Sequence, residues 1–512
     1  MTDPAPDDVA NVRAHDAKML GRLGYKQELA RRMSGFSNLA ISLSIICVLA
    51  GGLTSFHLGY CSVGGAAIGI GWPVACMMSL AVAAAMAQLA SAFPTAGGLY
   101  HWAAILGGRG WGWVTAWFNI VGLVTVLAAI NVGAFEFLTR AFLPDVEPGL
   151  SLQLSIVGVI TVSQAILNHL GIRLTTRLTD FSGYWILTVS LVLTVVLLAV
   201  TRSFDLSRLI TFSNFSGQPA DSPVWPGTES IAWLFALGLL LPAYTITGFD
   251  ASAHVAEETL NADHTVPVGI LRSVLVSGIA GWIMLSAIVL AIPDPAEAAA
   301  QGSTVFFGTL RAIVPPVVVH FLCGAIVVAQ YLCGLATVTS ASRMAFAFAR
   351  DGGLPFSNSL RTVHPDLKTP VAAIWTVSAA SFLFTVYSPV YSTITAVCTI
   401  SLYISYVLPI AIGFIVYRKS WKQMGPWDLG RWFRPLALVS VLYCTMLIVI
   451  GMQPPNDKSF IVLSGLCVLL LIGWFLAARR HFVGPPRIMQ ELRHARMGAS
   501  SLPSQVPEEA TT

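Results

Sequence analysis

Long runs of apolar residues, separated by short polar segments, follow one another through most of this chain of 512 residues. An α-helix needs about 20 residues to cross a bilayer, and nearly all of the runs are that long. The pattern therefore predicts about twelve membrane-spanning helices, at residues 36–58, 67–92, 112–140, 152–170, 181–200, 231–251, 269–292, 314–340, 370–387, 391–417, 435–452 and 460–479. The ninth run is short, and the eighth has a helical continuation as far as Arg350.

The composition agrees with a protein that spans a membrane many times. Hydrophobic residues make up 55% of the chain and charged residues 11%, whereas a soluble protein has about 25% charged residues. The mean hydropathy is +0.73. We therefore expect an all-α integral membrane protein in contact with the lipid bilayer, and the net charge of +4 calls for no nucleic-acid partner.

The basic residues indicate how the chain is oriented. Twelve spans place both termini on the same side, and most of the 29 Lys and Arg residues fall on that side. The exceptions are Arg140, Arg202, Arg208, Arg311 and Lys458. Because positive charges accumulate on the cytoplasmic side, we expect a multi-pass protein of the cell (plasma or inner) membrane with cytoplasmic N- and C-termini.

Polar segments flank the spans. Residues 1–35 form a cytoplasmic N-terminal segment, of which residues 1–17 are Pro-, Asp- and Ala-rich and are expected to be disordered. Residues 18–33 mix basic and apolar side chains, which is typical of a short helix at the membrane surface. Residues 483–512 are expected to form a disordered cytoplasmic tail.

The sixth apolar run contains an unusual group of polar residues. Thr245, Thr247, Gly248 and Asp250 lie close together near its end, and the acidic pair Glu257 and Glu258 follows. A charged side chain in the middle of a bilayer costs about 2.5–3.5 kcal/mol on insertion scales. The pattern favours a helix that opens so that its backbone can bind a ligand. The alternative is an ordinary span that ends near Gly248, with Asp250 among the lipid headgroups.

The first run has a second interruption, at Gly51 and Gly52, followed by Thr54 and Ser55. Glycine pairs also serve close helix packing, which is the alternative interpretation. The two interruptions are five spans apart, as an inverted repeat of five plus five helices would place them. Freed amides at Gly51–Leu53 would bind a carboxylate, and freed carbonyls from Tyr244 to Thr247 would bind an ammonium group.

Four segments of the chain resemble a known group of transporters. They are FSNLAISLSIICVLAGG, SAFPTAGGLYHWAA, TITGFDASAHVAEETLNADHTVPVGI and TSASRMAFAFARDGGLPFS. In this order they are similar to the amino acid–polyamine–organocation superfamily, in its branch of amino acid, GABA and choline permeases. The resemblance covers most of residues 35–420.

The resemblance implies a leucine-transporter-type fold with a 5+5 inverted repeat and broken helices 1 and 6. Residues 36–420 would form the ten-helix core, and residues 421–482 two peripheral helices. Transport would proceed by alternating access, with Tyr244 as a gating aromatic. By motif position the substrate-binding residues are Ala50, Gly51, Gly52, Leu53, Thr54, Tyr244, Thr245, Thr247, Gly248 and Asp250. No lysine occurs in span five, where several relatives have one, so the coupling ion stays open between H⁺ and Na⁺.

Two further groups of residues carry hypotheses. Glu257 and Glu258 are expected to control an inner gate without touching substrate, with Arg350 or Arg109 as partner. The hydroxyls of Thr337, Thr339 and Ser340 are candidates for a cation site, although such groups also bond back to helix carbonyls. Asn119, Asn131 and Glu136 are polar residues in span three; interhelical hydrogen bonding is the expected role of Asn131.

These observations favour a secondary transporter of a small amino acid or a GABA-like substrate. The alternative substrates are choline, ethanolamine or a polyamine; an aromatic cage for choline would draw on Tyr244, Phe249, Trp117 and Tyr403. A channel is disfavoured because only two spans are interrupted. No nucleophile–base group, ATP-binding loop or metal-site spacing occurs, so we expect neither an enzyme nor a resident cofactor or metal.

Overall fold

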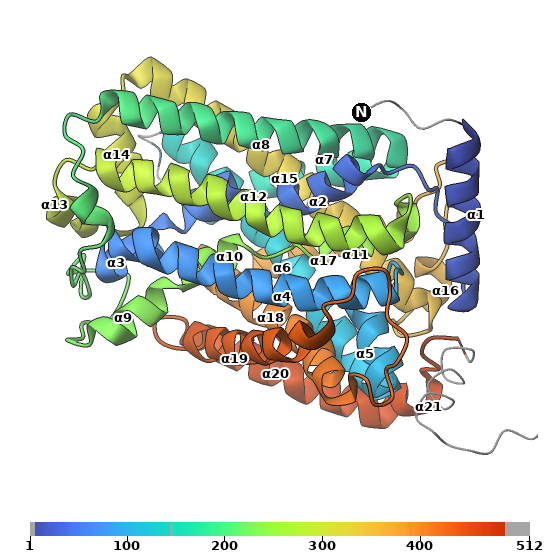
Figure 1. Cartoon of the computed structure of the whole chain (residues 1–512). Coiled ribbons are helices and arrows are strands. Elements are labelled where there is room, and N and C mark those ends of the chain that lie inside the picture. The colour runs from blue at the N-terminus through green and yellow to red at the C-terminus, as the bar shows by residue number, and fades with distance from the viewer. Residues whose placement is uncertain (1–5, 144–145, 147, 389, 487–512) are drawn as a thin grey trace, which may run out of the picture.

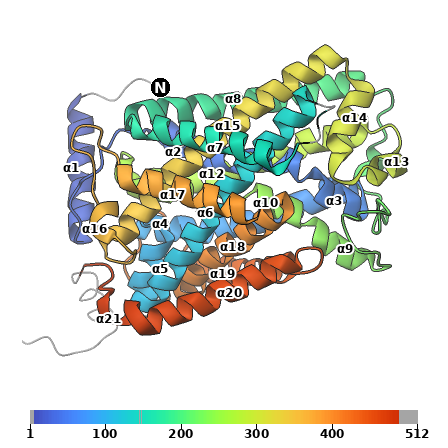
Figure 2. The same cartoon turned by 180° about the vertical axis from the view of Figure 1, so that it is seen from behind.

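The computed structural model describes residues 6–143, 146, 148–388 and 390–486. Within these residues every regular element is a helix, apart from two isolated β-bridges. The long helices lie side by side in one bundle, and α1 (Pro6–Arg22) crosses one end of it (Figure 1). The small helices α3, α9, α13 and α14 lie at the opposite end (Figure 2). The chain is therefore an all-helical membrane protein.

Ten helices of the described chain are long and apolar enough to cross a membrane. They are α2 with η1 (Gly35–Gly52), η2 with α4 (Ala67–Ala92), α6 (Arg109–Phe142), α7 (Leu150–His169), α8 (Ile172–Val200), α12 (Ala262–Ala291), α15 (Pro316–Arg350), α18 (Tyr391–Val416), η6 with α19 (Gly430–Gly451) and α20 with η7 and α21 (Lys458–His481). Two shorter apolar helices, at Ile231–Thr245 and at α17 (Val371–Tyr387), occupy the places of the sixth and ninth predicted runs. The expected continuation of the eighth run to Arg350 is confirmed.

Burial separates the centre of the bundle from its rim. In α6, 89% of the most apolar window is buried, against 22% in α7 and 11% in the segment Lys458–His481. The helix α6 packs along α15 and α18, while α12 packs along α4 and α2. The exposed side chains of the rim, such as Val159, Leu191 and Leu471, are apolar and suit contact with lipid.

Short helices connect or cap the long ones. They are α3 (Phe56–Val63), α5 (Leu99–Gly107), η3 (Leu206–Leu209), α9 (Ile231–Gly238), α10 (Leu240–Thr245), α11 (Ala251–His254), η4 (Ala256–Glu258), α13 (Pro295–Ala300), η5 (Gly302–Thr304), α14 (Val305–Ile313) and α16 (Ser357–Leu360). The helix α5 follows α4 at the end of the bundle where α1 lies (Figure 1).

The N-terminal segment differs from expectation. A helix occupies Pro6–Arg22, so the prediction of disorder is wrong for residues 6–17, and the stretch after Arg22 is mostly irregular. The carboxylate of Asp16 accepts hydrogen bonds from the amides of Asn261 (2.9 Å) and Ala262 (3.2 Å), at the start of α12. Long-range contacts of this kind order a polar segment that its composition alone marks as disordered. Residues 1–5, and 487–512 of the expected tail, lie outside the described part.

A buried ion pair joins α15 to the segment after α11. Arg343 and Glu258 are both 0% exposed. Arg343 donates from Nε to Oε2 of Glu258 (3.1 Å) and from Nη2 to Oε1 (3.0 Å). The carbonyl of Glu258 accepts from the amides of Arg32 and Met33, both at 2.9 Å. Helix α15, η4 and the N-terminal segment therefore meet at this pair.

Removing one partner of this pair should destabilise the whole bundle. We expect Arg343→Met to cost about 3–5 kcal/mol, because it leaves the Glu258 carboxylate buried and unpaired. Thermal unfolding of the purified protein in detergent measures the effect. The double variant Arg343→Met with Glu258→Leu should recover most of the loss, since two apolar side chains fill the site without a stranded charge. An unchanged melting temperature for Arg343→Met would contradict the anchoring role.

Candidate functional site

The sixth span is broken where the sequence predicted. The helix α10 ends at Thr245, α11 begins at Ala251, and Gly248 between them has a φ of +88°. Asp250 is 0% exposed, so the alternative that places it among headgroups is wrong. Within the described chain, the carbonyls of Thr245, Ile246 and Thr247 accept no hydrogen bond. The break thus presents a row of free acceptors.

The first span opens earlier than predicted. The helix α2 ends at Ile46, Cys47 has φ 14° and ψ 88°, and a π-helical turn, η1, occupies Val48–Gly52. The amide of Gly51 donates to the carbonyl of Cys47 (3.1 Å), and the amide of Leu53 donates to that of Ala50. The expectation of free amides at Gly51 and Leu53 is therefore wrong for this conformation.

The break in span one lies at Cys47, between α2 and η1, and the carbonyl of Cys47 accepts from the amides of both Ala50 (2.8 Å) and Gly51 (3.1 Å). The glycine pair correctly located the turn of the helix that opens, but the backbone hydrogen bonds of that turn differ from the expected ones. A glycine permits an opening, whereas the paths of the flanking backbone decide which donors lose their acceptors.

The two breaks face each other. A Cβ atom on Gly51 would lie 2.9 Å from Cα of Thr245, whereas one on Gly52 would meet Cδ2 of Leu285 at an ordinary 3.7 Å. On the other side of the opening, Ser42 Oγ donates to the carbonyl of Phe249 (3.0 Å). The opened turn of span one and the free carbonyls of span six therefore lie in one region of the bundle. Gly51 therefore permits close packing of the two spans at the place where the two breaks meet.

Tyrosine rings cover this region. The ring of Tyr244, which is 7% exposed, meets that of Tyr391 edge to face at a centroid distance of 6.3 Å. The hydroxyls of Tyr391 and Thr54 lie 2.5 Å apart, and Thr54 Oγ1 also donates to the carbonyl of Ala50 (2.5 Å). Tyr391, at the start of α18, was not found from the sequence because no motif marks it.

The four aromatic residues considered for a choline cage make different ring contacts. The ring of Phe249 packs on that of Tyr406 (5.1 Å), and the ring of Trp117 packs on those of Trp113 (6.0 Å) and Phe348 (6.1 Å). In the described chain none of the ring contacts joins two of the four candidates. The structure therefore does not assemble them as a cage by ring contact.

Asp250 holds the opened backbone in place. Its Oδ1 accepts from the hydroxyl of Tyr406 (2.7 Å), and that hydroxyl oxygen accepts from the amide of Gly248 (3.1 Å). Its Oδ2 accepts from Asn119 Nδ2 (3.1 Å) and lies 3.1 Å from His254 Nε2. Both carboxylate oxygens are thus engaged by protein groups. This geometry favours a role for Asp250 in positioning the backbone over the substrate contact that the resemblance implies.

The acidic pair after the break is buried and paired. Glu257 receives two hydrogen bonds from Arg350, at 2.8 Å to Oε1 and 3.0 Å to Oε2. It also accepts from the amide of Ala96 at 3.1 Å. The expected contact between Arg350 and Glu257 is therefore present, and Glu257 is fully buried rather than solvated. Arg109 instead donates to the carbonyls of Phe482 and Arg479.

A second buried cluster covers this pair on the side of the N-terminal segment. The guanidinium carbon of Arg350 lies 3.9 Å from the centre of the Tyr25 ring. The hydroxyls of Tyr25 and Tyr100 donate to Oδ2 of Asp351, at 2.7 and 2.8 Å, and His101 Nε2 lies 3.1 Å from it. Burial alone would raise the pKa of Asp351, but His101, Arg350 and Tyr25 hold that pKa below its ordinary value. The cluster is therefore charged and tightly bonded.

Two of the three hydroxyls proposed for a cation site bond back to helix carbonyls, which was the alternative interpretation. Thr337 Oγ1 donates to the carbonyl of Cys333 (2.9 Å), and Thr339 Oγ1 donates to that of Leu335 (3.1 Å) and to Asn168 Oδ1 (2.7 Å). Ser340 Oγ is buried without a hydrogen-bond partner. No hydrogen bond in the described chain joins any two of the three hydroxyls. Asn131, as expected, bonds between helices, to Thr161 Oγ1 (2.9 Å) and Gln164 Oε1 (3.0 Å).

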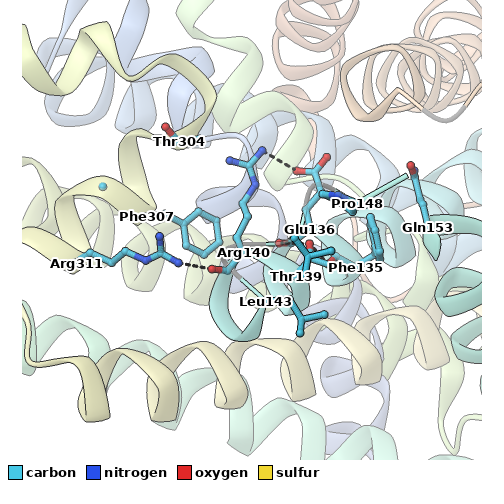
Figure 3. Close-up of a pocket in the computed structure, with 12 residues that line it drawn as sticks. Phe135, Glu136, Thr139, Arg140, Leu143, Pro148, Gln153, Thr304, Phe307 and Arg311 are labelled. Atoms are coloured by element: carbon cyan, nitrogen blue, oxygen red, sulfur yellow. Dashed lines mark hydrogen bonds and ion pairs between the residues drawn. The ribbon is translucent and has the colours of Figure 1, made fainter. Parts of the chain in front are cut away.

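A cavity of about 470 Å³ lies at the end of the bundle opposite α1, between α6 and α14 (Figure 3). Its polar groups include Glu136, Arg140 and Arg311. Arg140 Nη2 lies 3.9 Å from Glu136 Oε2, and Arg311 donates to the carbonyl of Arg140. The side chains of Glu136 and Arg140 are each 33% exposed, so both signs of charge are accessible from this cavity.

Comparison with known proteins identifies the family. A family described as "Amino acid permease" matches residues 33–476. The chain is 33% identical to "Amino-acid permease BAT1 homolog" of Oryza sativa subsp. japonica, over 91% of this chain and 94% of that protein. It is 32% identical to "Amino-acid permease BAT1" of Arabidopsis thaliana, over 91% and 95%. It is 29% identical to "Amino-acid permease 2" of Neurospora crassa, over 91% and 88%. The chain belongs to the amino acid permease family, and it is a secondary transporter of amino acids rather than an enzyme.

Proposed function

We propose that this permease moves a small amino acid or a GABA-like substrate across the cell membrane by alternating access. The proposed architecture has twelve spans, a leucine-transporter-type 5+5 inverted repeat and cytoplasmic termini. The observation that carries the proposal is the contact between the two breaks, where Gly51 lies against Thr245. Two helix interruptions that meet inside one bundle form the usual substrate site of such transporters.

The chemistry of the two breaks fits a zwitterion. The opened turn of span one around Cys47 would supply backbone donors for a carboxylate, and the free carbonyls of Thr245, Ile246 and Thr247 supply acceptors for an ammonium group. We propose that Ala50, Gly51, Leu53 and Thr54 line the same site, and that Gly52 contributes its backbone alone, since a Cβ there would point toward Leu285 of α12. Tyr244 closes it together with Tyr391, which limits the length of the substrate.

The same geometry disfavours the alternative substrates. A quaternary amine such as choline would need several rings around one point, and the four candidate aromatics do not contact one another by their rings. A polyamine would need free carboxylates, and both oxygens of Asp250 are already engaged. Transport of choline, ethanolamine or a polyamine is therefore the competing outcome of the uptake experiment described below.

We assign the inner gate to Glu257 with Arg350, and an anchoring role to Glu258. Glu257 bonds to a guanidinium that is 10% exposed, at the edge of the protein, whereas the Arg343 side chain that holds Glu258 is 0% exposed. A pair near the surface can part when the pathway opens, because water can solvate both charges. The intact Glu257–Arg350 pair corresponds to a state closed on the side of α1.

The proposed substrate class is tested by uptake into proteoliposomes. The panel contains radiolabelled small and large amino acids, GABA, choline, ethanolamine and a polyamine, with proton and sodium gradients imposed separately. We expect saturable uptake of one or more small amino acids or GABA, competed by unlabelled substrate. Saturable uptake of choline or a polyamine with none of any amino acid would overturn the proposed class.

The two glycines of span one should respond differently to a methyl group. Gly51→Ala should abolish uptake, because the new Cβ would press on the backbone of Thr245 and close the gap between the breaks. Gly52→Ala is the matched control and should keep at least about half of the activity, since its Cβ meets only flexible side-chain carbons. Initial rates of uptake, normalised to reconstituted protein, make the comparison. Equal activity of the two variants would contradict the placement of the site.

Neutralising the gate should change rates and leave affinity. Glu257→Gln keeps the size of the side chain but loses its charge-assisted bonds to Arg350, so the closed state becomes less populated. We expect initial uptake rates to change by about tenfold while the Kd in detergent stays within about twofold. Glu28→Gln, at an exposed carboxylate near the same surface, should change neither. If Glu257→Gln lost binding altogether, the residue would belong to the substrate site.

A further inference from the structure

We propose that Asp250 and His254 together form a proton-binding site that couples proton movement to the transport proposed above. The two side chains lie one helical turn apart, on and before α11, next to the break in span six. Both are 0% exposed, and His254 Nε2 lies 3.1 Å from Asp250 Oδ2. This inference rests on the proposed function and adds the identity of the coupling ion.

The hydrogen bonds around His254 require one extra proton. His254 Nδ1 lies 3.3 Å from the carbonyl oxygen of Ala96, which can only accept, so Nδ1 carries a hydrogen. A neutral imidazole protonated at Nδ1 has a lone pair at Nε2. That lone pair would face an ionised carboxylate at 3.1 Å. The contact is attractive only when a further proton sits on Nε2 or on Asp250 Oδ2.

The second buried histidine–aspartate pair of the chain has no such requirement. His101 Nε2 lies 3.1 Å from Asp351 Oδ2, but His101 Nδ1 lies 2.6 Å from the hydroxyl of Thr95. A hydroxyl can donate as well as accept. Neutral His101 can therefore carry its hydrogen on Nε2 and accept at Nδ1, with every contact satisfied. The comparison singles out Asp250 and His254 as the pair that holds a proton.

The proton site is bonded to both moving parts. On one side, Tyr406 links Asp250 Oδ1 (2.7 Å) to the amide of Gly248 (3.1 Å) in the broken segment. On the other side, the carbonyl of Ala96 accepts from His254, and the amide of Ala96 donates to Glu257 Oε1 (3.1 Å) in the gate. When the proton leaves, the imidazole loses either its bond to Asp250 or its bond to Ala96. Each loss removes support from an element that transport has to move.

The surroundings leave these two side chains to bind the proton. The elements packed against the pair carry further titratable or charged groups, which include Tyr100 and His101 on α5, Arg109, Glu136 and Arg140 on α6, Glu257 and Glu258 on η4, Asp263, His264 and Arg272 on α12, Arg343 and Arg350 on α15, and Tyr391, Tyr403 and Tyr406 on α18. Of these, Tyr406 alone makes a hydrogen bond to the pair in the described chain. Among the described residues, Lys and Arg form no ion pair with Asp250. A proton is thus the cation that neutralises this buried carboxylate.

The first experiment uses the unmodified protein in proteoliposomes. Tracer counterflow with radiolabelled proteinogenic L-amino acids and GABA reports transport without net coupling. Accumulation is then measured under an imposed gradient of one pH unit, with a protonophore control and a sodium gradient as comparison. For one proton per substrate we expect accumulation of up to about tenfold that the protonophore abolishes. A trapped pH indicator should show proton flux that depends on added substrate.

Two variants assign the proton to the pair. His254→Gln should retain measurable counterflow, which shows that the protein is folded, while its pH-driven accumulation falls to a ratio of about one. His101→Gln is the matched control, with the same substitution at the pair that needs no extra proton, and should keep its pH-driven accumulation. If His254→Gln fails to give folded protein, the substrate-dependent proton flux of the unmodified chain decides.

The outcomes separate this inference from the proposed function. Counterflow without pH-driven accumulation in the unmodified protein, or accumulation driven by sodium alone, would overturn proton coupling and leave the transport function standing. Unaltered pH-driven accumulation in His254→Gln would place the proton elsewhere. Absence of counterflow for every amino acid and GABA would overturn the proposed function itself.

Discussion

A membrane helix can open only if other groups take up the backbone bonds that it gives up, because the hydrocarbon offers no water to replace them. In span six several side chains do this work, and Ser42 Oγ donates to the carbonyl of Phe249. The hydroxyl of Tyr406 accepts from the amide of Gly248, and Asp250 holds that hydroxyl in place. The carbonyls from Thr245 to Thr247, which accept no hydrogen bond in the described chain, are then available to a ligand. The site is what remains after the rest of the break is satisfied.

The same requirement, that a buried polar group needs a partner, explains how charged side chains can occur inside this bundle. Glu257 and Glu258 are fully buried, and each is matched by two hydrogen bonds from one guanidinium. A planar guanidinium fits a carboxylate with two parallel bonds, which a lysine cannot do. The two neighbouring carboxylates are thus each paired with an arginine, but the side chain of Arg350 is 10% exposed and that of Arg343 is 0% exposed. That difference separates a pair that can open from a pair that holds the fold.

Much of this arrangement could be predicted from the sequence, and the limits follow from physics. Runs of apolar residues mark spans because lipid imposes a minimum length, and Gly248 beside two threonines marked the break in span six. The contact of Arg350 with Glu257 could be predicted because both residues lie on the predicted cytoplasmic side of the membrane. The partners of Asp250 could not, because Tyr406 is 156 residues away and only the packing of α18 brings it near. Likewise the order of residues 6–17 depends on Asp16 meeting the start of α12.

The short segment from Gly248 to Glu258 contains the opened backbone, the Asp250–His254 pair and the gate carboxylate. Because α11 is a single turn, these groups cannot move far relative to one another without breaking its few internal bonds. The peptide of Ala96, which lies before α5, bonds to both His254 and Glu257 and so extends this unit to a second element. A change of one proton or one substrate therefore acts on a unit that responds as a whole. In the proposed function this unit would switch between two arrangements, as alternating access requires.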